Sequence, residues 1–420
     1  MKDSKTLRFI DKYAGMLICF FFSLIFKTKR RRKLERIKNV LLLEFFEMSA
    51  SILAYSSIKY IKAKLDNPNI FFLCLDQSKS GLELLAIIPS QNIYAINATN
   101  CYSFLCSLLN QIMKLRKKNL DIIIDYELFF RVSAITSFLI KSRSKAGFYK
   151  YNLEGLYRGN FYDIKCAFNQ NSHIAKNFLA LTKSALEQNH HRPNLKEAIK
   201  TSEITLPQYK SDLDIKQTVV RKINNLYSVS PDQNLILICP DVGKVLPARN
   251  YPKDYYVKVI KRLLEKDSKN LILLIGVLEN MQTCSYIQNK VNHDRCINFC
   301  GYTATIKELM ELILLAKLFI GNDNGPAHFA SLTQTNTLVL FSIESPNMYG
   351  PLGKTVILYS FYHCSPCVSA FNHKSTVCRN NLCLQSLQPE KVADFATRLM
   401  HNELTYLTVN NQIPYILFDT

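Results

Sequence analysis

The sequence lacks the features by which several common protein classes are recognised. No Gly-x-Gly-x-x-Gly pattern follows its first β-rich segment, Val40–Phe45, which argues against a dinucleotide oxidoreductase. There is no basic run interleaved with aromatic residues and no nucleic-acid motif, so a nucleic-acid partner is not expected. The 13 cysteines are an odd number and are mostly scattered through apolar runs. This usage fits a reduced, cytoplasmic compartment better than a secreted disulfide scaffold.

Acidic residues are also few. The chain has 33 Asp and Glu against 53 Lys and Arg, which gives a formal net charge of +20. Such an excess favours a polyanionic partner or an anionic surface. The charge alone is compatible with nucleic acid, acidic lipid or a phosphorylated substrate.

The N-terminal region contains no apolar run long enough to span a bilayer. The run Tyr13–Phe26 has about 14 residues, whereas a span needs about 20. Six cations follow within residues 27–33, where a signal peptide would have small residues at a cleavage site. We interpret residues 1–38 as an apolar and basic membrane-proximal segment that contacts acidic headgroups at the cytoplasmic surface of the inner membrane. The alternative is a helix packed on the protein's own core.

The length of 420 residues suits two domains, and the pattern after Asn39 predicts an α/β fold in both. Continuously apolar strands alternate with helical segments, which is typical of parallel sheets covered on both faces. We predict two Rossmann-like, doubly wound domains facing across a cleft, with a ligand at the carboxyl ends of the strands. The expected boundaries are 1–38 for the membrane-proximal segment, 39–187 for the N-terminal acceptor domain, 188–232 for a linker, 233–402 for the C-terminal domain and 403–420 for a tail.

The individual elements follow from the apolar periodicity. The expected strands are Val40–Phe45, Ile70–Leu75, Ile93–Ile96, Ile122–Asp125 and Ala146–Tyr149, then Leu235–Cys239, Leu271–Gly276, Ile297–Gly301, Leu318–Asn322, Thr337–Phe341 and Val356–Tyr359. The expected helices are Ser51–Leu65, Leu82–Ile88, Tyr102–Leu115 and Phe130–Ile140, then Pro252–Glu265, Asn280–Val291, Ile306–Leu315, Pro326–Ser331 and Pro389–His401.

The segment GNDNGPAHFAS, Gly321–Ser331, follows an apolar strand and opens a helix. Asn324 suits the helix cap, and Gly325 lets backbone N–H groups approach an anion. Such a helix start is a ready phosphate site, and His328 lies one turn further on as a donor. The alternative is a well-capped helix with a buried histidine. The candidate donor-binding residues of the segment are Asp323, Asn324, Gly325, Pro326, Ala327 and His328.

This segment resembles the Asp-(Ser/Thr)-Gly-x-x-His signature of glycosyltransferase family 9, the ADP-heptose:lipopolysaccharide heptosyltransferase family. Cys239–Tyr256 is similar to the family's strand, loop and basic-aromatic-Pro helix start, and Gly301–Glu308 to its Gly-x-(Thr/Ser) turn. Met348–Gly353 resembles the loop after the penultimate strand. Leu41–Ile58 resembles the first strand, loop and helix of the acceptor domain.

The resemblance implies a GT-B architecture and inverting transfer of a heptose-like sugar without a catalytic metal. The donor would be an ADP-heptose-like nucleotide sugar, and the acceptor a lipopolysaccharide core or related glycolipid. It implies that Arg249 and His328 offset charge on the leaving nucleotide and that Thr303 contacts that nucleotide. Asp323 would hold the sugar or phosphate environment.

The sequence departs from the family where the catalytic base is expected. Many members carry Gly-Asp in the first loop, and that Asp is thought to be the general base, but Ser49-Ala50 stands there in this chain. Alanine cannot accept a proton. Glu44 and Glu47 lie on or before the same loop, and we take Glu47 as the candidate catalytic base. A sugar-nucleotide-binding protein without transferase activity is the main alternative, and a nucleotide-sugar epimerase is another.

Two further groups are candidates for binding. Arg158 and His173 lie between the last expected strand of the first domain and a helix, where they would bind an acidic acceptor or serve as structural partners of the loop. Cys364, Cys367, Cys378 and Cys383, with His373 between them, indicate one tetrahedral structural zinc site. Two labile disulfides or plain thiols are the alternatives.

Overall fold

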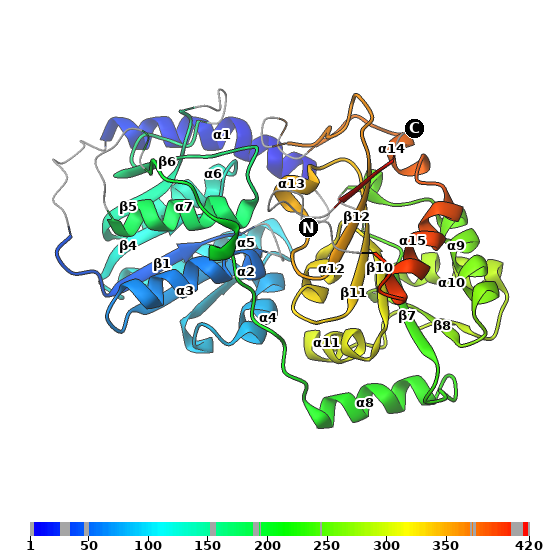
Figure 1. Ribbon diagram of the computed structural model, residues 1–420. Coiled ribbons are helices and arrows are strands. Elements are labelled where there is room, and N and C mark those ends of the chain that lie inside the picture. The colour runs from blue at the N-terminus through cyan, green and yellow to red at the C-terminus, as the bar shows by residue number, and fades with distance from the viewer. Residues whose placement is uncertain are drawn as a thin grey trace. The chain divides into compact units, whose positions relative to one another are not determined.

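The computed structural model describes residues 4–25, 34–45, 50–151, 157–187, 193, 195–243, 246–369, 372, 375–404 and 415–418. The chain forms two compact units that divide between Thr205 and Leu206, inside the segment expected as a linker. Each unit has a parallel sheet with helices on both faces (Figure 1). In these ranges no helix is both long and apolar enough to cross a membrane.

The first unit is built on six parallel strands in the order β3-β2-β1-β4-β5-β6. Central strands such as β1 are buried on both faces, which explains their continuous apolar sequences. Leu43 of β1 pairs with Asp125 of β4, so the carboxyl ends of these two strands adjoin. The strands are β1 (Asn39–Leu43), β2 (Asn69–Leu75), β3 (Ile93–Ile96), β4 (Leu120–Asp125), β5 (Ser142–Tyr149) and β6 (Ile164–Ala167).

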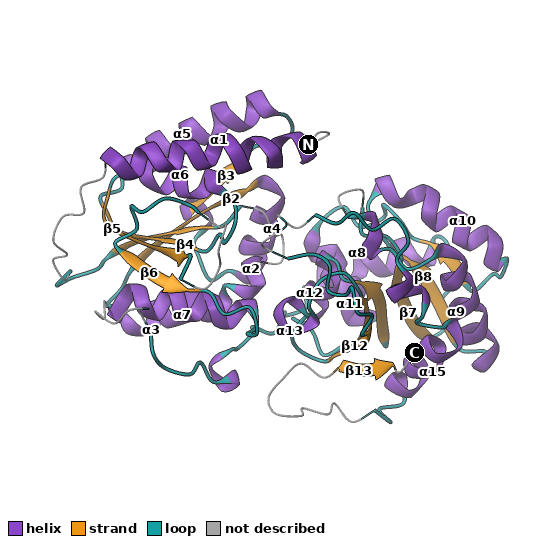
Figure 2. Cartoon of the chain, turned by 90° about the horizontal axis from the view of Figure 1, so that it is seen from above, coloured by secondary structure: helices purple, strands orange, loops and turns teal. Residues whose placement is uncertain are grey.

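The helices of this unit form two layers, with α1, α5 and α6 on one face of the sheet and α3 and α7 on the other (Figure 2). Right-handed crossovers place α3 on the opposite face from α5 and α6, because the chain moves one way along the sheet from β1 to β3 and the other way from β3 to β6. The helices are α1 (Ser4–Ile25), α2 (Ala50–Leu53), α3 (Tyr55–Lys64), α4 (Asp76–Leu85), α5 (Cys101–Arg116), α6 (Arg131–Leu139) and α7 (Ile174–Glu187), with 3-10 turns at Ser90–Asn92 and Thr201–Glu203.

Helix α1 packs against α6 along a narrow seam. Both carboxylate oxygens of Asp11 accept the backbone N–H of Arg131, at 3.0 Å each, which satisfies an otherwise unpaired group at the start of α6. Cys19 is buried, and Phe22 stacks on Phe138 with ring centroids 4.2 Å apart. One face of α1 therefore lies on the protein's own core, as in the alternative interpretation of this segment.

Replacing Gly15 with leucine should weaken this seam. A Cβ at Gly15 would lie 2.8 Å from the Cβ of Arg131, closer than two carbons can approach. We expect Gly15→Leu to lower the free energy of unfolding by about 1–3 kcal/mol through overpacking, measured by urea unfolding. Ala14→Leu is the matched control, because Ala14 is exposed and should change stability little. Equal stability of the two variants would contradict the seam.

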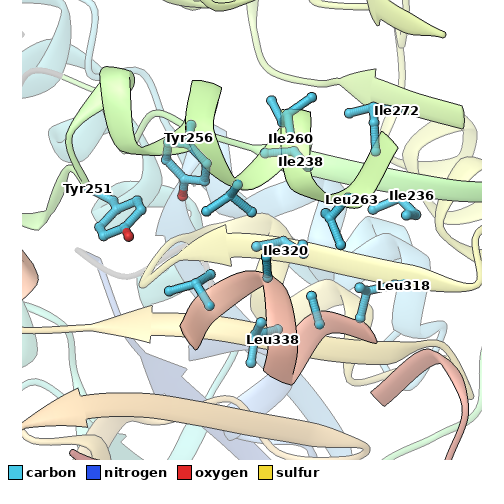
Figure 3. Close-up of a cluster of buried hydrophobic side chains, with 14 of the residues drawn as sticks. Ile236, Ile238, Tyr251, Tyr256, Ile260, Leu263, Ile272, Leu318, Ile320 and Leu338 are labelled. Atoms are coloured by element: carbon cyan, nitrogen blue, oxygen red, sulfur yellow. The ribbon is translucent and has the colours of Figure 1, made fainter. Parts of the chain in front are cut away.

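The second unit has seven parallel strands in the order β13-β12-β11-β10-β7-β8-β9. Helix α9 buries the apolar stripe of Tyr256, Ile260, Leu263 and Leu264 against the sheet (Figure 3). The strands are β7 (Asn234–Cys239), β8 (Asn270–Leu274), β9 (Cys296–Asn298), β10 (Leu318–Asn322), β11 (Asn336–Phe341), β12 (Thr355–Ser360) and β13 (Tyr415–Phe418).

Helices also cover both faces of the second sheet. Helices α10 and α15 pack on α9, whereas α8 and α12 contact α11. The helices are α8 (Leu213–Asn224), α9 (Lys253–Lys266), α10 (Met281–Val291), α11 (Ile306–Leu315), α12 (Gly325–Ala330), α13 (Pro346–Tyr349), α14 (Leu382–Gln385) and α15 (Pro389–Met400), with 3-10 turns at Pro247–Arg249 and Leu278–Asn280.

Several elements were not expected from the sequence, among them β6, β13 and α8. Strand β6 has only four residues, and its alternating pattern includes a lysine, so it gave little apolar signal. Strand β13 pairs in parallel with β12 and lies in the segment expected as a tail. Helix α8 lies in the segment expected as a linker, where Asp212 caps its first turn.

Candidate functional site

The predicted phosphate loop joins β10 to α12 at the carboxyl edge of the second sheet. The Asn324 side chain accepts the backbone N–H of Ala327 at 3.1 Å, and Pro326 lies in the first turn, as the sequence predicted for a helix cap. The Asn324 amide also donates to the Cys239 Sγ on the neighbouring strand at 3.3 Å. Gly325 opens the helix, and His328 lies buried within it. The loop is thus fixed from both sides by its own cap and by β7.

Beside this loop lies a buried cluster of three charged groups. The Arg249 Nε is 3.5 Å from the Asp323 Oδ2, and an Arg249 terminal nitrogen donates to Glu344. Both acids are almost completely buried, while the arginine keeps 20% of its side chain exposed. The Nε of Arg249 and the Oδ2 of Asp323 make no hydrogen bond to any described residue. Buried polar atoms without a hydrogen bond call for an explanation, and a bound ligand would supply one.

The charges of the cluster adjust each other's pKa values. Burial raises the pKa of Asp323, and this rise is opposed by the Arg249 charge and by a hydrogen bond with Glu344. Burial by itself would lower the pKa of Arg249, but the two carboxylates outweigh it and raise that pKa. Arg249 therefore stays cationic where an anionic ligand would meet it.

A second buried residue, Asn322, aligns the loops around the cluster. Its side-chain oxygen accepts the Tyr251 backbone N–H and the Tyr256 hydroxyl, each at 3.2 Å, and its amide donates to the Pro240 carbonyl at 2.9 Å. These bonds tie the end of β10 to the loop after β7, to Tyr251 just before α9 and to Tyr256 within α9 (Figure 3). Arg249, in the turn before Tyr251, is positioned by the same contacts.

Thr303 lies apart from the cluster on the same edge of the sheet. It follows β9, which is three strands away from β10, or about 14 Å at a spacing of about 4.8 Å. Gly301 has a φ of +80°, and a Cβ there would approach the Leu278 Cδ2 to 2.6 Å, so the tight turn requires glycine. Thr303 is half-buried. Only an extended ligand would reach both Thr303 and Arg249.

In the first unit, the candidate base Glu47 lies outside the described residues. The strand before it is well fixed, since the Glu44 N–H donates to the Leu73 carbonyl at 3.1 Å. The Phe45 N–H donates to the Glu127 Oε1, also at 3.1 Å. Glu44 and Glu127 are buried at the carboxyl ends of β1 and β4. Carboxylates therefore gather where the first loop leaves the sheet, and Ala50 begins α2 beyond it.

Arg158 is held in a buried ion pair. Its NH2 nitrogen lies 2.5 Å from the Asp125 Oδ2, and the Tyr162 hydroxyl donates to the same oxygen at 2.5 Å. Burial raises the pKa of Asp125, while the Arg158 charge opposes the rise. Arg158 also donates to two backbone carbonyls, those of Phe130 and Glu127. These contacts favour the structural alternative for Arg158 over acceptor binding.

His173 lies at the start of α7. Its Nδ1 accepts the Ala175 backbone N–H at 3.3 Å, its carbonyl accepts the Asn177 N–H, and its side chain is buried. The ring thus acts as a cap for the helix, which again favours the structural alternative.

The four cysteines of the predicted zinc site are all described, but His373 is not. Cys364 is exposed, Cys383 is buried, and the other two are partly exposed free thiols. Burial raises the pKa of the Cys383 thiol to about 11. Within the described ranges, no three His, Cys, Asp or Glu side chains are grouped so that they could hold a metal ion. The structure gives the zinc prediction no support.

Two residues of the site were missed from the sequence. Glu344 follows β11 by three positions, and only the pairing of β11 with β10 brings it to Arg249. Asn322 was assigned merely as the end of a strand. The available signals were an asparagine at the end of one apolar strand and a glutamate shortly after the next, because the carboxyl ends of neighbouring parallel strands meet at one sheet edge.

Two parallel α/β units, with a capped helix start and a fixed cation at one carboxyl edge, define a protein of the GT-B type. More particularly, the chain belongs to glycosyltransferase family 9 (heptosyltransferase), whose sequence pattern matches residues 109–377. Family membership and the fold class are therefore confirmed.

Individual relatives match over shorter stretches. The lipooligosaccharide heptosyltransferase 2 of Campylobacter jejuni (serotype O:2) is 27% identical over 160 residues, covering 37% of this chain and 48% of that protein. The lipopolysaccharide heptosyltransferase 2 of Escherichia coli K12 is 25% identical over 145 residues, covering 33% and 40%. The chain thus spans about half the length of the curated relatives it matches.

Solved structures are similar over nearly the whole fold. The E. coli ADP-heptose lipopolysaccharide heptosyltransferase II gives a TM-score of 0.64 at 16% identity, covering 87% of this chain and 99% of that chain. The family 9 glycosyl transferase of Veillonella parvula gives 0.68 at 13% identity, covering 89% and 100%. An E. coli heptosyltransferase solved with ADP gives 0.59 at 14% identity, covering 86% and 99%. At these identities the likeness concerns the fold.

Proposed function

We propose that the protein is a glycosyltransferase that moves a heptose-like sugar from a nucleotide-diphosphate donor to a lipopolysaccharide-core or related glycolipid. The observation that carries this proposal is the buried Arg249–Asp323 pair beside the capped start of α12. Backbone N–H groups at a helix start and a fixed guanidinium at one edge suit a diphosphate. Related structures solved with ADP and with ADP-2-deoxy-2-fluoro heptose make an ADP-linked sugar the first donor to test.

The reaction would be an inverting displacement that needs no metal. The acceptor hydroxyl oxygen attacks the anomeric carbon while the bond from that carbon to the diphosphate oxygen breaks. The hydroxyl proton passes to a carboxylate of the first unit, for which Glu47 is the candidate. Arg249, the backbone N–H groups of Asn324 and Gly325, and His328 offset the charge that develops on the leaving nucleotide. Asp323 fixes Arg249 and the sugar, and Thr303 holds the far end of the nucleotide.

The acceptor side of the proposal places the protein at the cytoplasmic surface of a membrane. Helix α1 offers a largely exposed apolar face, and the sequence continues into the cations of residues 27–33. An apolar helix flanked by cations binds acidic bilayers at the interface. A glycolipid acceptor would be anchored in the same surface.

A thermal-shift screen of nucleotide sugars tests the donor site. We expect ADP and ADP-sugars to stabilise the chain by about 2.7 kcal/mol at a hundredfold excess over Kd. Adenosine should have little effect because it lacks the diphosphate that Arg249 and the loop would bind. The sugar nucleotide with the largest shift is then tested for transfer to lipid extracts. Equal shifts with adenosine and ADP would overturn the diphosphate site.

A second candidate function follows from Ala50. A chain without the family's base would bind the same donors but would not turn them over. That outcome would appear as donor-dependent stabilisation without transfer, and with no effect of changing Glu47.

A further inference from the structure

Helix α1 exposes far more apolar surface than a helix on a soluble protein's surface normally does. Its inner seam contains Asp11, Gly15 and Cys19, four residues apart, with Phe22 and Ser23 half-buried at its end. The other positions from Phe9 to Ile25 are exposed. The most exposed of the large side chains is Ile25, at 73%. The exposed large apolar residues of α1 are Phe9, Ile10, Tyr13, Met16, Leu17, Ile18, Phe20, Phe21, Leu24 and Ile25.

Helix α5 repeats this pattern in the same unit. Leu108, Ile112 and Leu115 form its buried face. Its outer face is also apolar, with Tyr102 79%, Leu105 51%, Leu109 56% and Met113 59% exposed. These four positions follow helical spacing and form one stripe along α5. A globular core does not account for a stripe that points away from it.

The two exposed stripes lie on one side of the first unit. Helices α1, α5 and α6 lie on the same face of the sheet (Figure 2). Helix α6 connects the other two, because its Phe138 stacks on Phe22 of α1 while its Val132 packs into the cluster that contains Leu108 of α5. One flat object could therefore contact both stripes.

The charged residues around the two stripes indicate what kind of surface they contact. Lys114, Arg116, Lys117 and Lys118 follow the stripe at the end of α5, Lys12 lies on α1, and residues 27–33 hold six cations in the sequence. Apolar side chains edged by cations match the acyl boundary and acidic headgroups of a bilayer. A second copy of this chain would bring the same cations together, and their repulsion disfavours such a dimer.

We propose that α5 is a second membrane-contacting helix, so that the first unit lies on an acidic bilayer through α1 and α5 together. This rests on the proposed function, in which the acceptor is a glycolipid of that bilayer. Two helices on one face fix the orientation of the unit, whereas a single anchor would leave it free to rotate. Periodicity could not reveal this role, because α5 is apolar on its inner and outer faces alike.

An environment-sensitive dye on Cys106 tests the contact directly. Cys106 is exposed next to Leu105 and Leu109. The full chain would carry serine at Cys101, Cys364, Cys367 and Cys378, so that Cys106 is the accessible thiol. We expect a blue shift of dye emission with phosphatidylcholine vesicles containing phosphatidylglycerol, and a weaker shift at high salt. A dye at Leu213→Cys, in a Cys106→Ser background, should show no shift.

A triple variant measures the contribution of the stripe. Leu105→Gln/Leu109→Gln/Met113→Gln should weaken binding to the acidic vesicles by about tenfold or more, because three apolar side chains no longer leave water. The matched control is Leu213→Gln/Leu226→Gln/Val377→Gln, which changes three exposed apolar residues of the second unit. This control should bind as the unchanged chain does.

The outcomes separate this inference from the proposed function. If the chain binds vesicles but the Cys106 dye shows no emission shift and the triple variant binds as well as the unchanged chain, the role of α5 is overturned. Helix α1 would then remain as the anchor. A triple variant that changes the oligomeric state but not vesicle binding would overturn it in favour of a second copy. Donor-induced stabilisation and sugar transfer in detergent test the proposed function independently of either result.

Discussion

Replacing Arg249 with methionine is expected to lower the free energy of unfolding by about 3–5 kcal/mol and kcat for transfer by about 10²–10³-fold. The stability is lost because Asp323 and Glu344 stay buried without their shared cation. The rate is lost because the leaving diphosphate no longer meets a guanidinium. Urea unfolding and steady-state transfer assays measure the two effects.

The matched control is Arg262→Met in the same unit. Arg262 pairs with Glu390 at 2.8 Å, but both side chains are 49% exposed, so water replaces the lost partner. Surface pairs of this kind contribute about 0–1 kcal/mol. If Arg249→Met were no more destabilising than Arg262→Met, the buried cluster would not have the charges assigned to it.

The Arg249→Met deficit should also depend on pH. Burial raises the pKa of Asp323, and removing Arg249 removes a charge that opposes the rise. The folded variant therefore binds a proton at a pH where the unfolded chain, with a pKa near 3.8, does not. Its deficit is full above the folded pKa and shrinks as the pH falls through that value. Unfolding at pH 8 and pH 5 checks the sign, and a deficit that grows toward pH 5 would contradict it.

Replacing Asp323 and Glu344 with their amides separates the effect of Arg249 on stability from its effect on catalysis. In Arg249→Met/Asp323→Asn/Glu344→Gln no charge is left buried, so much of the stability should return. The transfer rate should stay low, since the cation is still missing. Recovery of both would mean that Arg249 acts on catalysis only by keeping the fold intact.

Local patterns predicted this protein well where local forces decide the structure. The strand Leu318–Asn322 and the helix Ile306–Leu315 have the bounds expected from their apolar runs, and Asn324 caps α12 because its side chain needs only the next turn. The roles of Glu344 and Arg158 could not be predicted from local patterns. Their roles depend on partners 95 and 33 residues away, which strand order brings together. For a helix such as α5, the sequence also does not show which face is buried, because both of its faces are apolar.

Changing Glu47 to glutamine should reduce kcat by about 10²–10⁴-fold while donor-induced stabilisation stays unchanged. The candidate is favoured because the carboxylates at the carboxyl ends of β1 and β4 are already engaged or buried. Asp125 is already paired with Arg158 and Tyr162 inside the core. Glu127 binds the Phe45 backbone, and Glu44 is buried. Glu47 follows Phe45 by two residues in the sequence.

Its pH profile distinguishes a base from a structural carboxylate. A base must be deprotonated to accept the acceptor's proton, so the rate of the unchanged enzyme should fall on the acid side. Glu47→Gln should lose this acid limb as well as the rate, whereas Glu83→Gln, at an exposed carboxylate of the same unit, should keep both. Transfer by Glu47→Gln at the native rate would exclude it as the base. Glu127 would then be the next carboxylate to change, because it already contacts the backbone from which the loop departs.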